Sequence, residues 1–70
     1  MMSHQTYGYI ELVGSSEVGS DDAVNNAIEA ASKTIKNMDW FEVKETRGHI
    51  VGAAVKHWQV TLKIGYRLES

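Results

Sequence analysis

The clearest pattern in the chain is a strict alternation of apolar and polar residues near its C-terminus. Apolar side chains occupy every second position from Trp58 to Leu68, and polar or small residues stand between them. A period of two predicts a β-strand that buries one of its faces. We expect this strand to run from Val55 to Leu68.

A second pattern, with a period close to 3.6 residues, lies in the first half of the chain. Its apolar positions are Val24, Ala27, Ile28, Ala31, Ile35 and Met38. This spacing predicts an amphipathic helix. We expect Ser20 to cap its N-terminus, ahead of two aspartates that suit the helix dipole. Lys33 and Lys36 are expected near its end, with Asn37 as the C-terminal cap.

Two further segments rich in aromatic and β-branched residues predict strands, at Tyr7–Val13 and Trp40–Ile50. The predicted order is β-α-β-β, an α+β fold in which a three-stranded antiparallel-type sheet packs on one helix. We expect a flexible N-terminus at Met1–Thr6 and a single domain over 7–70. A two-residue turn at Gly52–Ala53 would join the last two strands.

This turn also predicts which residues of the hairpin face each other. It pairs Thr46 with Gln59 and Trp40 with Gly65, which would leave open space beside the indole. Trp40 and Gln59 would then lie about 20 Å apart along the hairpin. A flat ligand touching both residues would have to take them from different subunits. A longer turn would shift this register by two positions.

A single helix covers only one face of such a sheet. We expect it to cover the apolar face of the last strand, together with Phe41, Val43, Ile10 and Leu12. The other face would hold Tyr7, Tyr9, Glu11, Val13, Trp40, Glu42, Lys44, Thr46, His57, Gln59, Thr61 and Lys63. An exposed tryptophan among polar residues commonly marks an interaction site. The charged residues around it are expected to be solvated, or paired across strands or subunits.

Charge and composition narrow the classes of partner. The chain has 7 basic and 9 acidic residues, for a net charge of −2. This balance argues against a nucleic-acid-binding protein. No apolar run is long enough to span a membrane, and Met1–Thr6 lacks the features of a signal peptide. We therefore expect a cytoplasmic protein.

Size and cysteine content indicate how the fold is stabilised. A chain of 70 residues builds a small core, and it contains no cysteine for disulfides or thiolate metal sites. Its histidines, His4, His49 and His57, match no strong zinc pattern, so no metal is expected. Association with copies of the same chain is the remaining way to bury more surface.

Several segments together resemble the dodecin family. They are Tyr9–Gly14, Ala30–Thr34, Asp39–Val43, Arg47–His49 and His57–Leu68, within a resemblance that runs from about Tyr7 to Glu69. The resemblance implies a small flavin-binding protein with a β-α-β-β fold, assembled from trimers into a hollow homododecamer. It implies flavin storage or buffering and protection from flavin photochemistry, and no enzymatic turnover. Bacterial members similar to this chain favour FMN; riboflavin is a possible alternative, and some members also bind coenzyme A.

The resemblance also assigns residues to the flavin site. It makes Trp40 the tryptophan that stacks on the flavin, in pairs between symmetry-related chains, and Gln59 the amide at the flavin edge. Arg47 matches a ligand-contacting position of bacterial relatives. Asp39 and Arg67 are weaker candidates of the same kind.

The residues themselves leave alternatives open. Trp40 also fits a core or interface tryptophan, and Gln59 fits a solvated polar residue. Arg47 shares its alternation with Phe41 and Val43, which places it on the helix-covered side. A phosphate contact by Arg47 therefore needs a strand that runs beyond the helix, or a bulge. The alternative functions are a cofactor-free oligomeric interaction module and a small flavoenzyme.

Overall fold

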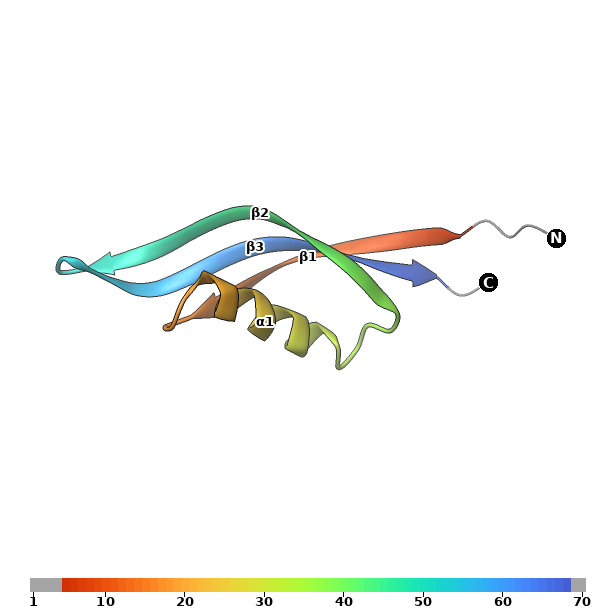
Figure 1. Cartoon of the computed structure of the whole chain (residues 1–70), viewed down its shortest axis with the longest axis horizontal. Helices are drawn as coiled ribbons and strands as arrows, with labels where there is room; N and C mark the ends of the chain where they lie inside the picture. Colours follow the sequence, from red (N-terminus) through yellow and green to blue (C-terminus); the bar gives the residue numbers. More distant parts are fainter. Residues whose placement is uncertain (1–4, 69–70) are drawn as a thin grey trace.

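The predicted order of elements is confirmed. A computed structural model describes residues 5–68 and contains β1 (Thr6–Ser16), α1 (Ser20–Ala31), β2 (Met38–Val51) and β3 (Ala54–Leu68). The strands form one antiparallel sheet in the order β1-β3-β2, and α1 lies against one side of it (Figure 1). The fold is therefore the α+β arrangement expected, with β3 at the centre of the sheet.

The N-terminal segment Met1–Thr6, expected to be flexible, is described only in part. Met1–His4 lie outside the described residues. Thr6, expected in a flexible segment, is instead the first residue of β1 and pairs with Leu68.

Among the residues that the structure describes, no helix is long and apolar enough to cross a membrane.

The core lies between α1 and the central strand. It consists of Val60, Leu62 and Ile64 from β3 and Ala23, Ala27 and Ala31 from α1, and partly buried Ile10 and Leu12 of β1 pack against it. Burial of each large side chain of β3 contributes about 1.5–3 kcal/mol. The alternation that predicted a buried face of β3 is confirmed.

The small residues of α1 allow the helix to approach the sheet closely. A Cβ added to Gly14 of β1 would overlap the carbonyl oxygen of Ala23 and lie 2.8 Å from the Cβ of Ala27. Only glycine at position 14 therefore accommodates the helix backbone at this distance. The close approach seats α1 over β1 and β3.

Beyond Met38, the edge strand β2 is largely left exposed by α1, which packs mainly on β1 and β3. Phe41 and Val43 point to the helix side of the sheet but remain 48% and 49% exposed. The expectation that the helix buries both residues is wrong. A single helix of 12 residues that lies over β1 and β3 does not extend across the sheet to β2.

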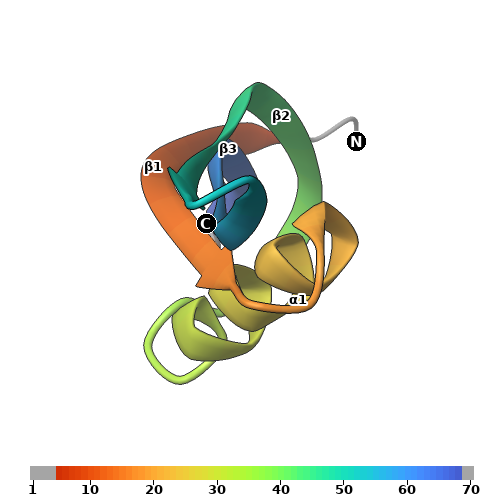
Figure 2. The same ribbon diagram turned by 90° about the vertical axis from the view of Figure 1, so that its left-hand side faces the viewer.

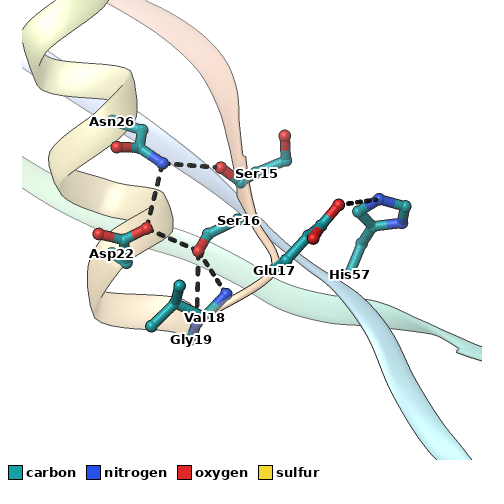
Figure 3. Close-up of polar contacts among 8 residues, drawn as sticks. All are labelled: Ser15, Ser16, Glu17, Val18, Gly19, Asp22, Asn26 and His57. Carbon is teal, nitrogen blue, oxygen red and sulfur yellow. Dashed lines mark hydrogen bonds and ion pairs between the residues drawn. The ribbon is translucent and has the colours of Figure 1, made fainter.

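The start of α1 also differs from the prediction. The N-cap position is Gly19, Ser20 is already helical, and Gly19 forms no side-chain cap hydrogen bond. Instead, Ser16 Oγ accepts the N–H groups of Val18 at 2.8 Å and Gly19 at 3.3 Å, and donates to Asp22 Oδ2 at 2.7 Å (Figure 3). A serine at the end of β1 thus organises the loop that enters the helix.

The helix ends earlier than its apolar pattern indicates. Its last residue is Ala31, followed by Ser32 as the C-cap, and its last turn contains no basic residue. Asn37 is therefore not the helix cap. It has a φ of 62° at the entry to β2, and its carbonyl accepts the backbone N–H of Arg67 at 3.0 Å. Met38, counted in the helical pattern, begins β2 and packs against the core from there.

The register of the β2–β3 hairpin is as predicted at both ends and shifted by one residue between them. Val51 pairs with Ala54, and Trp40 pairs with Gly65, but Arg47 rather than Thr46 pairs with Gln59. The shift arises because the pairing is irregular between Val43 and Glu45 and again between His49 and Ile50. Lys44 is an extra residue in β2, and Lys56 is an extra residue in β3 that restores the register.

The tip of the β2–β3 hairpin extends beyond the rest of the fold (Figure 1). The last residue of β1, Ser16, pairs with Trp58, so the strands continue past this point as a two-stranded ribbon. Ile50 is 75% exposed at its tip, and Val51 and Val55 are exposed as well. Because an isolated two-stranded ribbon is marginally stable in water, this apolar tip is suited to contact with another chain.

Candidate functional site

The face of the sheet opposite α1, which we call the open face, carries all of the aromatic and polar residues of interest. Viewed from the hairpin end, the sheet is curled with α1 on one side of it, and the open face is the other side (Figure 2). By the strand pairing, this face contains Tyr7, Tyr9, Glu11, Val13, Ser15, Trp40, Glu42, Glu45, Arg47, His49, His57, Gln59, Thr61, Lys63, Gly65 and Arg67. The extra residue Lys44 reaches it through its ion pair with Glu11. Thr46, expected here, pairs with buried Val60 and therefore lies on the helix side.

One end of the open face is an aromatic platform around Trp40. Three indole carbons, Cζ2, Cε2 and Cη2, lie where a Cβ of Gly65 would stand. The indole therefore fills the space expected to be open beside it and rests on the backbone of β3. Tyr7 packs against it edge to face, with ring centroids 5.4 Å apart and planes inclined by 66°. Trp40 is nevertheless 41% exposed, so it offers a supported flat surface to a partner.

The middle of the open face is a band of cross-strand charge pairs. Lys63 Nζ lies 3.5 Å from Glu42 Oε1 and 4.4 Å from the centroid of the Tyr9 ring. Lys44 Nζ lies 3.9 Å from Glu11 Oε2. Such exposed ion pairs contribute little to stability, typically less than about 1 kcal/mol.

The far end of the open face holds Arg47 and Gln59. The Arg47 Nε–H donates a hydrogen bond to Gln59 Oε1 over 3.1 Å. The expectation that Arg47 lies on the helix-covered side is wrong, because the extra residue Lys44 inverts the alternation of β2 before it reaches Arg47. The bulge required for an outward-facing Arg47 is therefore present.

The other sequence-predicted residues lie at the Trp40 end. Asp39 is exposed and forms an extra residue in β2 between Met38 and Trp40. It lines a cavity of about 220 Å³ together with Ile28, Met38, Trp40, Phe41 and Ile64. Arg67 pairs with Tyr7 across β1 and β3. The structure thus places Trp40 and Arg67 at one end of the open face and Arg47 and Gln59 at the other, while Asp39 lies next to Trp40 in a pocket shared with Ile28 of α1.

The two ends are too far apart for one small ligand. Trp40 pairs with Gly65, and Gln59 lies six positions away from Gly65 in β3. At about 3.3 Å per residue, this is a separation of roughly 20 Å. The predicted separation of Trp40 and Gln59 along the hairpin is therefore confirmed.

A polar cluster that sequence reasoning missed braces β1 next to Gln59. Asn26 Nδ2 donates to the carbonyl oxygen of Ser15 at 3.1 Å and to Asp22 Oδ2 at 3.3 Å (Figure 3). Ser15 is the β1 partner of Gln59. In the sequence, a serine and an asparagine close to a first-turn aspartate indicate that the helix begins with polar residues. The hydrogen bond to β1 could not be predicted in this way, because it depends on how α1 packs on the sheet.

A second contact ties the loop after β1 to the hairpin. His57 Nε2 lies 3.7 Å from Glu17 Oε2 (Figure 3), and the His57 ring packs edge to face against His49, with centroids 6.3 Å apart. Within residues 5–68, no group of three or more metal-ligating side chains is arranged to hold an ion. The candidate His4 lies outside the described residues.

Comparison with known proteins gives consistent similarities over nearly the whole chain. The family model described as Dodecin matches residues 6–69. A curated dodecin of Thermus thermophilus is 51% identical over 65 residues, covering 93% of this chain and 94% of that protein. The solved dodecin of Streptomyces coelicolor is 52% identical with a TM-score of 0.92, covering 99% of both chains. The dodecin of Streptomyces davaonensis is 47% identical with a TM-score of 0.92, covering 97% of this chain and 100% of that one.

Proposed function

The chain belongs to the dodecin family, and we propose that it is a flavin-binding storage protein that sequesters FMN at contacts between copies of itself. Riboflavin is a second flavin of the same class, and coenzyme A a further possible ligand. The proposed assembly is the homododecamer, built from trimers, that the family resemblance implies. In it, flavins are held in stacked pairs between tryptophans of symmetry-related chains.

The observation that carries the proposal is the supported indole of Trp40. It rests on Gly65 and against Tyr7, and it is 41% exposed on a face that α1 leaves bare. A bound flavin supplies a flat, conjugated ring system with hydrogen-bonding groups along one edge. Offset stacking of such a ring on an indole contributes about 0.5–1.5 kcal/mol beyond the area buried. Close stacking is also expected to quench the excited flavin.

The residues at the other end of the open face fit the polar parts of the same ligand. Gln59 carries both a donor and an acceptor, as a flavin edge requires. Arg47 carries a guanidinium that suits the phosphate of FMN. Because these residues lie about 20 Å from Trp40 within one chain, a flavin that contacts both ends takes them from different copies. The proposed site is therefore completed by assembly.

The open face favours flavin storage over enzymatic turnover. Its acidic and basic groups Glu11, Glu42, Lys44 and Lys63 are engaged in pairs with each other. Stacking on both sides would also close the flavin to a substrate. A small flavoenzyme would show steady-state turnover with a reductant and an acceptor well above that of free FMN.

A second candidate function is a cofactor-free oligomeric module. The exposed apolar tip at Ile50, Val51 and Val55 favours association whether or not a ligand binds. This alternative predicts a colourless protein that assembles fully and gains no thermal stability from added FMN. An absorption spectrum and a light-scattering mass of gently purified protein separate the two functions.

The test of the stacking role compares the two tryptophans of the chain. Trp40 lies on the open face, whereas Trp58 alternates with the buried residues of β3 on the helix side. Replacing Trp40 with alanine should release FMN or restore its fluorescence, while Trp58→Phe should bind and quench FMN as the wild type does. FMN binding by Trp40→Ala with unchanged affinity and quenching would refute the proposal.

A further inference from the structure

We propose that Arg47 is a positioning residue that orients the amide of Gln59, so that each chain presents an N–H donor to a carbonyl oxygen of the flavin ring. This role is separate from any contact between Arg47 and a phosphate. It rests on the proposed flavin-binding function and specifies which hydrogen bond the site offers.

The orientation follows from the chemistry of the two side chains. An arginine Nε–H donates and never accepts, so its partner in the 3.1 Å contact is the oxygen of the Gln59 amide. The oxygen and the NH2 group of an amide stand on opposite sides of the same carbon. Once Oε1 is held by Arg47, the Nε2 donor is directed away from Arg47. A glutamine without this contact presents either group by rotation of its terminal torsion.

The backbone places the two residues side by side. Lys44 is the extra residue of β2 that turns Arg47 toward the open face, directly across from Gln59. On the other side of β3, Gln59 is paired with Ser15, whose carbonyl oxygen accepts a hydrogen bond from Asn26. Gln59 is thus held in the central strand between two ordered neighbours, and its remaining freedom is the rotation of its amide.

The contact leaves the rest of the guanidinium available. Among the described contacts of Arg47, the bond to Gln59 uses only Nε. The Nη groups therefore stay free for an anion such as the FMN phosphate. The two roles of Arg47 differ in what they require: the phosphate contact requires a positive charge, and the orientation of Gln59 requires an N–H donor within reach of Oε1.

Riboflavin separates the roles because it has the flavin ring and no phosphate. If Arg47 orients Gln59, Arg47→Ala should weaken riboflavin binding by about five- to tenfold, the usual effect of one hydrogen bond. Gln59→Ala should have a similar effect on riboflavin, and the double variant should be no worse than Gln59→Ala alone. FMN should show an additional loss in Arg47→Ala. Isothermal titration with both flavins gives all of these constants.

Conservative variants test the orientation directly. Arg47→Met keeps much of the length of the side chain and removes every N–H donor, so it should lose riboflavin affinity as Arg47→Ala does. Gln59→Glu keeps an oxygen for Arg47 and removes the NH2 donor, so it should lose riboflavin affinity as Gln59→Ala does. If Arg47→Ala disturbs the assembly, Gln59→Glu still decides the proposal, because it retains Arg47 and its partner oxygen.

A vibrational readout reports the hydrogen bond itself. A donor to a flavin carbonyl lowers the C=O stretching frequency of bound riboflavin, measured by infrared difference spectroscopy. In Arg47→Ala and Gln59→Glu the frequency should rise toward that of the unbonded carbonyl. The control is Trp58→Phe, on the helix side of the sheet, which keeps both residues of the Arg47–Gln59 pair and should leave the carbonyl frequency unchanged.

Three results would overturn the proposal. If the riboflavin affinity of Arg47→Ala stays within twofold of the wild type with an unshifted carbonyl frequency, Arg47 does not orient Gln59; the same result in Gln59→Glu would mean that Gln59 gives the flavin no donor. Absence of any flavin binding by the wild-type assembly would overturn this proposal together with the proposed function. That failure is seen before any variant is compared, so the two are distinguishable.

Discussion

The substitution Gly65→Ala tests whether the position of the indole, and not merely its presence, makes the candidate site. A Cβ at residue 65 would overlap Cζ2, Cε2 and Cη2 of Trp40 at once. The backbone of the central strand is fixed between β1 and β2, whereas the indole is 41% exposed. We therefore expect the side chain of Trp40 to turn away and the sheet to remain.

The size of the effect follows from which contacts are lost. Displacing a half-exposed ring at the sheet surface should lower the free energy of unfolding by only about 1 kcal/mol, far less than a deletion in the core. The stacking geometry is worth about 0.5–1.5 kcal/mol beyond area, so the FMN dissociation constant should rise about two- to tenfold. The expected signature is weaker and less quenched FMN binding by a protein whose sheet still folds.

The assay combines an FMN fluorescence titration with urea unfolding of the apo-protein. The matched control is Gly8→Ala, in the strand next to Gly65. Its Cβ would meet the Tyr66 ring, 2.7 Å from the hydroxyl, on the helix side of the sheet, and should leave FMN binding intact. Wild-type FMN affinity and quenching in Gly65→Ala would refute the argument that the supported indole forms the site.

Three further substitutions test the fold. Gly14→Ala brings a Cβ against the backbone oxygen of Ala23 and should cost about 1–3 kcal/mol in urea unfolding, since the helix must shift; an unchanged midpoint would contradict the close approach of α1. Leu62→Ala empties a fully buried site and should cost about 2–5 kcal/mol, measured by thermal or urea unfolding, and a loss below 1 kcal/mol would mean that β3 is not the core strand. His57→Gln removes the contact with Glu17 and should change the free energy of unfolding at pH 6 by less than about 1 kcal/mol, because both side chains are exposed; a larger loss would make this contact a main support of the hairpin.

The apolar alternation of β3 predicted its buried face correctly because the central strand has partners on both sides. Because β3 lies between β1 and β2, irregular pairing of an edge strand does not expose Val60, Leu62 or Ile64. The helix pattern was less decisive. Apolar residues continue through Ile35 and Met38, but both contact the core from outside the helix. A period of 3.6 residues records which side chains reach the core, and it does not record where the backbone stops being helical.

The candidate site was predicted in parts. The resemblance identified Trp40, Gln59 and Arg47 as residues of interest, and simple alternation placed the first two on the open face. It failed for Arg47 because a single extra residue inverts every later position of a strand. Nothing in the sequence around Lys44 marks it as the extra residue of β2. The shift in register is seen only in the pairing of β2 with β3.

By itself, the sequence determined the order of the elements, the buried face of β3 and the exposure of a tryptophan on the opposite side, because these depend on local periodicity and on having a single helix for two faces. Only the tertiary structure decided that α1 leaves β2 bare, that the indole rests on Gly65, and that Arg47 meets Gln59. These features depend on close approaches and bulges, in which a displacement of one residue or of a few ångströms changes which side chains touch. Such displacements are settled by the packing of the whole chain and leave no periodic signal in the sequence.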